Sequence, residues 1–306
     1  MRLSIITTLY YSEPDLKEFY KKISISARKI TNNYEIIFVN DGSPDNSLNI
    51  AVYLYEKDPK VKIIDFSRNF GHHKAMMTGL MHAQGDIVFL IDCDLEEDPE
   101  LVESFYAEYI KNDDIDVVYG VQKSRKGRFF EKLSGNIFYW LINILSTYPI
   151  PANLVTSRLM SKRYVNNLVK HKDREVFMAG LWAITGFKQV PLMVEKRDKK
   201  TTSYDIGKKF SLLVNSITSF SNKPLLFIFY LGCVILLVSS ITALYLVIKR
   251  AFFGVLLAGW PSLIVTIWFF GGLTIFCVGL IGIYLSRVFM ETKDRPYTII
   301  RKIYER

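Results

Sequence analysis

The sequence predicts an α/β domain with a mostly parallel sheet, followed by two helices that are long enough to cross a membrane. Three observations support this prediction. The first 120 residues alternate between strand-like and helix-like segments. Two later stretches, Leu225–Ile248 and Ala251–Ser286, contain no charged residue. Within the first 120 residues, an acidic cluster follows an apolar run at Ile87–Ile91. Together they indicate a ligand-binding domain attached to a membrane anchor.

The N-terminal alternation predicts its elements in order along the chain. Apolar and β-branched runs predict strands, and longer amphipathic runs predict the helices between them. Strand–helix alternation is typical of a parallel sheet with helices on both faces. The predicted strands are Leu3–Thr8, Glu35–Val39, Val61–Phe66, Asp86–Asp92 and Asp116–Tyr119. The predicted helices are Pro14–Ile30, Ser47–Glu56, Lys74–Ala83 and Pro99–Asn112.

Polar side chains collect where these strands end. Asp41 follows the second strand, Arg68 follows the third, and Asp92 and Asp94 follow the fourth. Ligands of such sheets bind outside the carboxyl ends of the strands. Because three separate strand ends carry polar groups, we expect a binding site at this edge of the sheet.

The acidic cluster, LIDCDLEEDPE, has six carboxylates between Asp92 and Glu100. In an extended chain, residues two apart point to the same side, so Asp92, Asp94 and Glu96 could face one ion. Mg²⁺ and Mn²⁺ prefer such oxygen ligands, together with substrate phosphates. Glu97, Asp98 and Glu100 fit the acidic start of a helix at Pro99. A solvated acidic turn without a metal remains an alternative for the cluster.

Two amphipathic segments come before the predicted membrane spans. Residues 128–148 mix aromatic and aliphatic side chains with Glu131, Lys132 and Asn136, which predicts a helix lying in the membrane surface. A helix packed on the sheet domain is the alternative, because an apolar stripe is also the ordinary core-facing pattern. Residues 206–224 form a second candidate that leads into the first span.

The predicted membrane spans are residues 225–248 and 259–286, since about 20 apolar residues cross a bilayer. Basic residues precede the first span and follow the second, whereas only Lys249 and Arg250 lie between the spans. This excess of basic residues outside the two spans predicts that both chain ends and the domain over residues 1–205 lie in the cytoplasm, with a basic tail at 287–306. The net charge of +9 then indicates attraction to anionic lipids, and no nucleic-acid motif accompanies it. The three cysteines have no metal-binding spacing, so a reducing compartment without disulfides is expected.

Four motifs taken together carry a family resemblance: SIITTLYYSEPDL, EIIFVNDGSPDNS, SRNFGHHKAMMTGL and GDIVFLIDCDLEEDPE. Their order resembles family 2 glycosyltransferases with the GT-A fold, a Rossmann-like, nucleotide-sugar-binding α/β domain. SRLMSKRYV, NSITSFSNKPL and the two spans resemble one branch, the polyprenyl-phosphate glycosyltransferases such as bactoprenol glucosyltransferases and dolichol-phosphate-mannose synthase. The resemblance covers nearly the whole chain.

The resemblance implies roles for residues that match the family motifs. Thr8, Tyr10, Asp41, Arg68 and Asp92 would bind the donor nucleotide. Asp92, Asp94 and Glu96 would hold Mg²⁺ or Mn²⁺ on the diphosphate. Asp94 and Arg158 would be catalytic, and the acceptor phosphate would be bound by Arg125, Lys132, Ser134 and Arg158.

Some positions depart from the family pattern. Thr8 replaces a usual Pro, Tyr11-Ser12 replaces a usual Asn-Glu pair, and Glu96 replaces a usual Gln. Thr156 replaces the Asp of a Gly-Asp-Phe-Arg-Leu motif that many bacterial relatives carry. A phosphate acceptor needs no general base, because its second pKa is about 6 and it is mostly dianionic near neutral pH.

The resemblance therefore implies an inverting, metal-dependent transferase of the bacterial inner membrane. It would move one sugar, most simply glucose from UDP-glucose, to undecaprenyl phosphate for cell-wall or lipopolysaccharide synthesis. A processive polysaccharide synthase and a non-catalytic scaffold of the same fold are the alternatives. The sugar, the pathway and self-association into a homo-oligomer are left open by the sequence.

Overall fold

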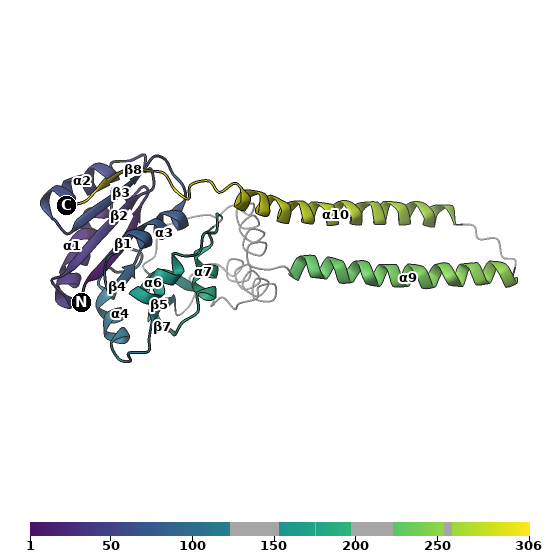
Figure 1. Ribbon diagram of the computed structural model, residues 1–306, viewed down its shortest axis with the longest axis horizontal. Coiled ribbons are helices and arrows are strands. Elements are labelled where there is room, and N and C mark those ends of the chain that lie inside the picture. The colour runs from purple at the N-terminus through teal and green to yellow at the C-terminus, as the bar shows by residue number, and fades with distance from the viewer. Residues whose placement is uncertain (123–152, 175, 197–222, 254–258) are drawn as a thin grey trace. The chain divides into compact units, whose positions relative to one another are not determined.

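The computed structural model describes residues 1–122, 153–174, 176–196, 223–253 and 259–306 (Figure 1). These residues fall into two compact units. One unit contains the described residues up to 196 together with 295–306, and the other contains the described residues from 223 to 294.

The first unit is built on an eight-stranded sheet of described residues, in the order β7-β5-β6-β4-β1-β2-β3-β8. β1 pairs in parallel with β2 and β4, and β2 pairs in parallel with β3. β6 runs antiparallel to both β4 and β5, and β8 runs antiparallel to β3. β5 also pairs in parallel with β7, so the described sheet is mostly parallel, as predicted. The strands are β1 Leu3–Leu9, β2 Tyr34–Asn40, β3 Val61–Phe66, β4 Ile87–Leu90, β5 Val117–Gln122, β6 Leu154–Ser161, β7 Gln189–Val194 and β8 Ile300–Tyr304.

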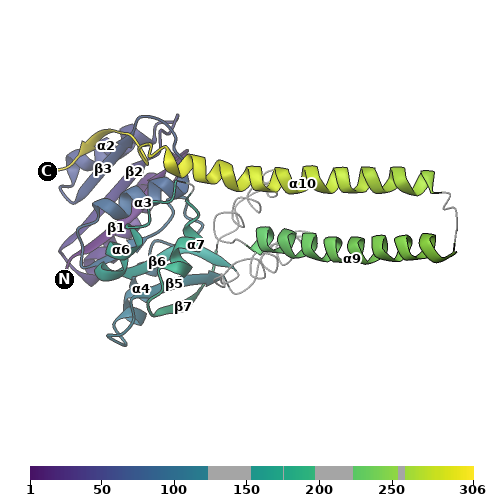
Figure 2. The same ribbon diagram turned by 45° about the vertical axis from the view of Figure 1, so that its right-hand side comes forward.

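Helices cover both faces of this sheet. Alternate residues of a strand point to opposite faces. Ile5 and Phe38 belong to a core cluster with side chains of α1, α2 and α4, whereas Ile6 and Val39 lie against Gly79 of α3. α3 also contacts α6 (Figure 2). The helices are α1 Leu16–Ile30, α2 Ser47–Lys57, α3 His72–His82, α4 Leu101–Tyr109, α6 Lys162–Leu168 and α7 Met178–Ile184.

All nine elements predicted before residue 120 are present, with boundaries shifted by a few residues. β6, β7, α6 and α7 were not predicted, and β6 is an antiparallel strand inserted beside β4. Its residues, LVTSRLMS, are all buried or half-buried, so they show no alternation between apolar and polar side chains. The predicted amphipathic helix over residues 128–148 and most of the one over 206–224 lie outside the described residues.

The last strand comes from the chain after α10, within the segment that was expected to be a basic tail. β8 pairs with β3 from Ile63–Tyr304 to Phe66–Ile300 (Figure 1). Arg301 lies 3.6 Å from the buried Asp65 and donates a hydrogen bond to the carbonyl of Ser67. Tyr304 stacks edge-on against Tyr55. The tail thus completes one edge of the sheet, which the sequence did not predict.

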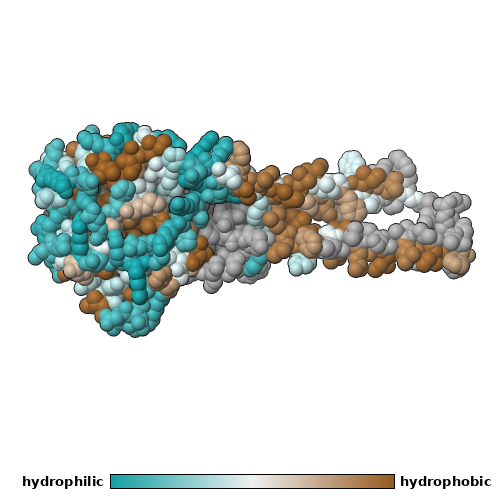
Figure 3. All heavy atoms as spheres, viewed as in Figure 1, coloured by the Kyte–Doolittle hydropathy of each residue, from teal (hydrophilic) through white to brown (hydrophobic). Residues whose placement is uncertain are grey.

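The second unit contains two long helices, α9 (Lys223–Phe253) and α10 (Trp260–Thr292). Large apolar side chains are exposed along them, including Phe227, Trp268 and Ile275 (Figure 3). Among the described residues, one stretch, Thr266–Thr292, is long and apolar enough by length and composition to cross a membrane. The other predicted span falls on α9 and stays a prediction.

Candidate functional site

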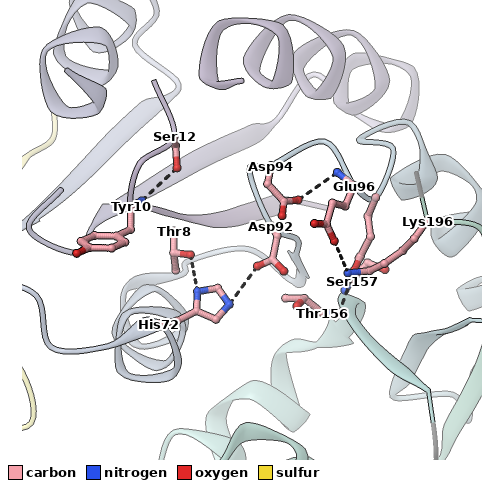
Figure 4. Close-up of polar contacts among 11 residues, drawn as sticks. Thr8, Tyr10, Ser12, His72, Asp92, Asp94, Glu96, Thr156, Ser157 and Lys196 are labelled. Atoms are coloured by element: carbon pink, nitrogen blue, oxygen red, sulfur yellow. Dashed lines mark hydrogen bonds and ion pairs between the residues drawn. The ribbon is translucent and has the colours of Figure 1, made fainter. Parts of the chain in front are cut away.

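The predicted strand ends meet at one edge of the sheet. β1, β2, β3 and β4 are neighbours and run in the same direction. Their carboxyl ends therefore bring Thr8, Asp41, Arg68 and Asp92 to the same side of the domain. Figure 4 shows the part of this edge around Asp92.

Asp41 fixes the loop between β3 and α3. Its carboxylate accepts hydrogen bonds from the backbone N–H groups of Phe70 (2.7 Å) and Gly71 (3.1 Å). Burial raises the pKa of Asp41, and these two hydrogen bonds oppose the rise. A Cβ on the next residue, Gly42 (φ +62°), would meet the Arg68 carbonyl carbon at 2.5 Å. The absence of a side chain at Gly42 therefore lets the Asp41 and Arg68 loops pack together.

Arg68 and Tyr10 are exposed at this edge. The guanidinium of Arg68 lies 4.1 Å from the centre of the Phe70 ring and donates a hydrogen bond to the Asn69 carbonyl. Tyr10 is half-exposed, and its ring contacts Tyr11 edge-on. Both side chains are accessible to a ligand, and their roles in binding a nucleotide stay predictions.

Asp92 is held by groups from three separate elements. His72, the first residue of α3, places Nε2 3.2 Å from Asp92 Oδ1, and its Nδ1 lies 2.9 Å from the hydroxyl of Thr8 on β1 (Figure 4). Burial raises the pKa of Asp92, but the neighbouring His72 and Thr156 side chains and the charge of Lys196 bring the pKa below its ordinary value. Burial lowers the pKa of His72, and Asp92 reverses this and raises it. Asp92 is therefore held as a carboxylate.

The turn after Asp92 brings a second carboxylate beside it. Asp94 accepts a hydrogen bond from the backbone N–H of Glu96 (3.1 Å), and Leu95 between them has a positive φ of 56°. Glu96 points to Lys196 and pairs with it at 3.2 Å. In the part of the chain that the structure describes, no three His, Cys, Asp or Glu side chains are grouped to hold a metal. Figure 4 shows the Asp92 and Asp94 side chains next to each other, and Glu96 as a third ligand stays a prediction.

Asp92 and Asp94 nevertheless suit a hard divalent cation. Mg²⁺ is usually held by one or two carboxylates, and substrate phosphates and water complete the coordination. Asp92 Oδ1 is buried and has no hydrogen bond of good geometry among the described residues, although His72 lies within ion-pair distance. A buried carboxylate oxygen without a hydrogen bond can bind a cation. Asp92 and Asp94 therefore fit a divalent metal ion.

Glu97, which the sequence analysis assigned to the acidic start of a helix, is instead buried against β6. The side chain has no exposed surface. It accepts hydrogen bonds from the backbone N–H groups of Thr156 (3.3 Å) and Ser157 (2.8 Å), and Lys196 lies 3.3 Å away. Burial and the charge of Asp92 raise the pKa of Glu97 against the effect of Lys196. Glu97 thus ties the acidic turn to β6.

Arg158 is buried in the sheet domain. Its side chain is 1% exposed, and its guanidinium carbon lies 3.1 Å from the centre of the Trp182 ring. Nε and Nη1 have no hydrogen-bond acceptor among the described residues. Burial lowers the pKa of Arg158 to about 9, which leaves it cationic at neutral pH. Its predicted contact with the acceptor phosphate is untested, and Arg125, Lys132 and Ser134 lie outside the described residues.

Sequence reasoning missed the part that three side chains play in this site: His72, Glu97 and Lys196. His72 lies in a quoted motif, and its place at the start of a helix beside a strand end was a usable signal. Glu97 was hidden among five other acids. Lys196 follows β7, which was not predicted, so no sequence signal connected it with the acidic turn.

Comparison with known proteins identifies the fold and its relatives. The model of "Glycosyl transferase family 2" matches residues 4–169. A protein of Mycobacterium tuberculosis named "Putative glycosyltransferases" is 56% identical over 304 residues, covering 99% of this chain and 89% of that protein. The "Prophage bactoprenol glucosyl transferase homolog" of Escherichia coli is 32% identical and covers 99% of both chains.

Solved structures show the same fold. Glucosyl-3-phosphoglycerate synthase from Mycobacterium tuberculosis, crystallised with Mn²⁺, UDP-glucose and phosphoglyceric acid, aligns with a TM-score of 0.52 at 18% identity. The alignment covers 71% of this chain and 79% of that one. At this identity the likeness describes the fold alone.

Proposed function

The chain belongs to glycosyl transferase family 2, and we propose that it transfers one sugar from a nucleotide sugar to a polyprenyl phosphate. One observation carries the choice of acceptor. The relative named for bactoprenol glucosyl transfer matches 99% of both chains, so the match extends through α9 and α10 as well as through the sheet domain. UDP-glucose is the donor we favour.

Different residues at this edge of the sheet would have different roles in the reaction. Asp92 and Asp94 would hold Mg²⁺ or Mn²⁺ against the donor diphosphate, with Glu96 as a further ligand. The cation would neutralise the negative charge that develops on the departing nucleoside diphosphate. Tyr10, Arg68 and the Asp41 loop would bind the nucleotide at the neighbouring strand ends.

The acceptor end requires orientation of a phosphate. Arg158, Arg125, Lys132 and Ser134 would carry out this role. Two N–H groups of Arg158 have no acceptor among the described residues, and an anion would provide one. Thr156, at the position of the family motif's Asp in the resemblance, has no carboxylate to act as a general base. A phosphate acceptor does not need one, because it is mostly dianionic near neutral pH. Attack from the side opposite the leaving group inverts the anomeric carbon.

The proposed location is the bacterial inner membrane. The acceptor's phosphate lies at the depth of the lipid headgroups, and the exposed apolar side chains of α9 and α10 suit a lipid environment. The distribution of Lys and Arg favours a multi-pass protein with its catalytic domain and both termini in the cytoplasm.

The test is to incubate the purified full-length protein with undecaprenyl phosphate, Mg²⁺ and a panel of nucleotide sugars, and to weigh the extracted lipid by mass spectrometry. We expect a lipid heavier by one hexose, formed from UDP-glucose and lost when a chelator is added. Unchanged lipid with every donor would reject the proposed acceptor.

A further inference from the structure

Two departures from the family pattern lie beside the same carboxylate. Thr8, which replaces a usual Pro, contacts His72, and His72 contacts Asp92. The side chain of Thr156, which replaces a usual Asp, lies beside Asp92 (Figure 4) and lowers its pKa. These groups come from β1, α3 and β6, so three elements that are distant in sequence converge on Asp92 (Figure 4).

The two ring nitrogens of His72 have different partners, which fixes how the imidazole is oriented. Nδ1 lies 2.9 Å from Thr8 Oγ1, and Nε2 lies 3.2 Å from Asp92 Oδ1. A carboxylate only accepts hydrogen bonds, so the group that faces it must be an N–H. In the neutral ring, Nδ1 then accepts from the Thr8 hydroxyl, and in the charged ring that hydroxyl accepts from Nδ1. In both forms, Thr8 holds the ring with Nε2 toward Asp92.

A Pro at position 8 could not make this contact, because its side chain has no hydrogen-bonding atom. An Asp at position 156 would put a carboxylate next to Asp92 and beside Glu97, which would add like charge to a buried cluster. Thr8 thus supplies a hydroxyl group where Pro would supply none, and Thr156 supplies a hydroxyl group where Asp would add a charge.

We propose that Thr8 and His72 are positioning residues that orient the Asp92 carboxylate toward the cation on the donor diphosphate. This inference rests on the proposed function only in requiring a divalent cation and a nucleoside diphosphate at Asp92 and Asp94. Groups that orient a metal ligand typically change metal affinity or activity by about 10–100-fold when they are removed. His72 does not contact the reacting atoms in this arrangement, and it acts through Asp92.

Two substitutions of His72 test its contact with Thr8 and its contact with Asp92 separately. The amide nitrogen of Gln reaches the place of Nε2, so His72→Gln keeps a donor toward Asp92. The shorter Asn reaches the place of Nδ1, so His72→Asn keeps a partner for Thr8 and loses the contact with Asp92. Thr8→Val removes the hydroxyl at almost constant volume. His82→Gln is the matched control, because His82 lies on the same helix and its Nδ1 contacts only the Thr78 carbonyl.

The primary readout is the affinity of the full-length protein for Mn²⁺ in the presence of UDP, measured from the electron paramagnetic resonance signal of free Mn²⁺. We expect His72→Asn to weaken Mn²⁺ binding about 10–100-fold and His72→Gln to remain within about threefold of the native protein. Thr8→Val should fall between them, and His82→Gln should match the native protein. In transfer assays, His72→Asn should lower kcat and leave the KM for the lipid unchanged.

Native Mn²⁺ affinity in His72→Asn, or equal losses in the Asn and Gln variants, would overturn the inference. Absence of UDP-dependent Mn²⁺ binding by the native protein would also overturn it. If His72→Asn does not fold, the comparison of Thr8→Val with the native protein decides, and an unchanged affinity there rejects the role of Thr8. The proposed acceptor can fail separately, because Mn²⁺ and UDP binding are measured without any lipid.

Discussion

The guanidinium carbon of Arg158 lies 3.1 Å from the centre of the Trp182 ring, inside the domain and away from solvent. A planar guanidinium makes this contact well, whereas the compact ammonium of Lys does not. We expect Arg158→Ala to reduce sugar transfer at least about tenfold, and Arg158→Lys to raise the KM for the lipid phosphate. Steady-state kinetics with a lipid concentration series would measure both effects.

Thermal unfolding must accompany these assays, because Arg158 fills space in the core. Arg28→Lys is the control, since this exposed arginine lies on α1 and hydrogen-bonds to Tyr34. A folded Arg158→Ala variant with the native transfer rate would show that the buried charge has no part in the reaction.

Asp94 should be indispensable for catalysis. Asp94→Ala removes one of the two carboxylates available to the cation, and loss of charge stabilisation at a leaving group typically costs about 100-fold or more in rate. We expect transfer to fall by at least this factor and UDP-dependent Mn²⁺ binding to be lost. Asp113→Asn, on an exposed loop, should retain both. A non-catalytic scaffold would show no transfer before or after the substitution.

Glu35 should make the stability of the protein sensitive to acid. Its buried carboxylate accepts hydrogen bonds from the Ser4 hydroxyl (2.5 Å) and the Gln84 N–H (2.8 Å), and Lys62 lies 3.1 Å away. Burial raises the pKa of Glu35, but these contacts outweigh it and bring the pKa below its ordinary value. The folded state therefore binds fewer protons than the unfolded state as pH falls. The stabilisation is complete above the unfolded pKa of about 4.3 and is lost as pH falls through the folded pKa.

We expect Glu35→Gln to lower the thermal unfolding midpoint near neutral pH and to flatten its decline below about pH 4.3. Midpoints recorded across this range for the native protein, Glu35→Gln and the exposed control Glu56→Gln would test both effects. Parallel curves for the native protein and Glu35→Gln would contradict this assignment.

Loss of β8 should destabilise the sheet domain. A stop in place of Ile299 would leave β3 as an unpaired edge and would remove Arg301 from the buried Asp65. An open edge strand is also a template for aggregation. We expect a lower unfolding midpoint and an aggregated fraction in size-exclusion chromatography. Removing Arg306 alone should have a small effect, and an unchanged midpoint after the full deletion would refute a structural role for β8.

The parallel part of the fold was predictable because each strand is a short apolar run that ends in polar residues. Asp41, Arg68, Asp92 and Asp94 could be assigned to one edge from strand direction alone. β6 and β8 could not be predicted this way, because their pairing depends on contacts with strands far along the chain. The sequence also could not separate Glu97 from Glu96. Neighbouring acids look equivalent until the backbone of β6 buries one of them.

β8 also constrains the path of the whole chain. Because Ile300–Tyr304 pairs with β3 in one folded body, the described residues up to 196 and residues 295–306 must lie on the same side of any bilayer. The chain between them can therefore cross a bilayer only an even number of times. If the apolar stretch Thr266–Thr292 of α10 crosses, another segment before it must cross in the opposite direction, and α9 has the length to do so. Since β8 follows α9 and α10 along the chain, the edge of the sheet is closed only after both helices have been made.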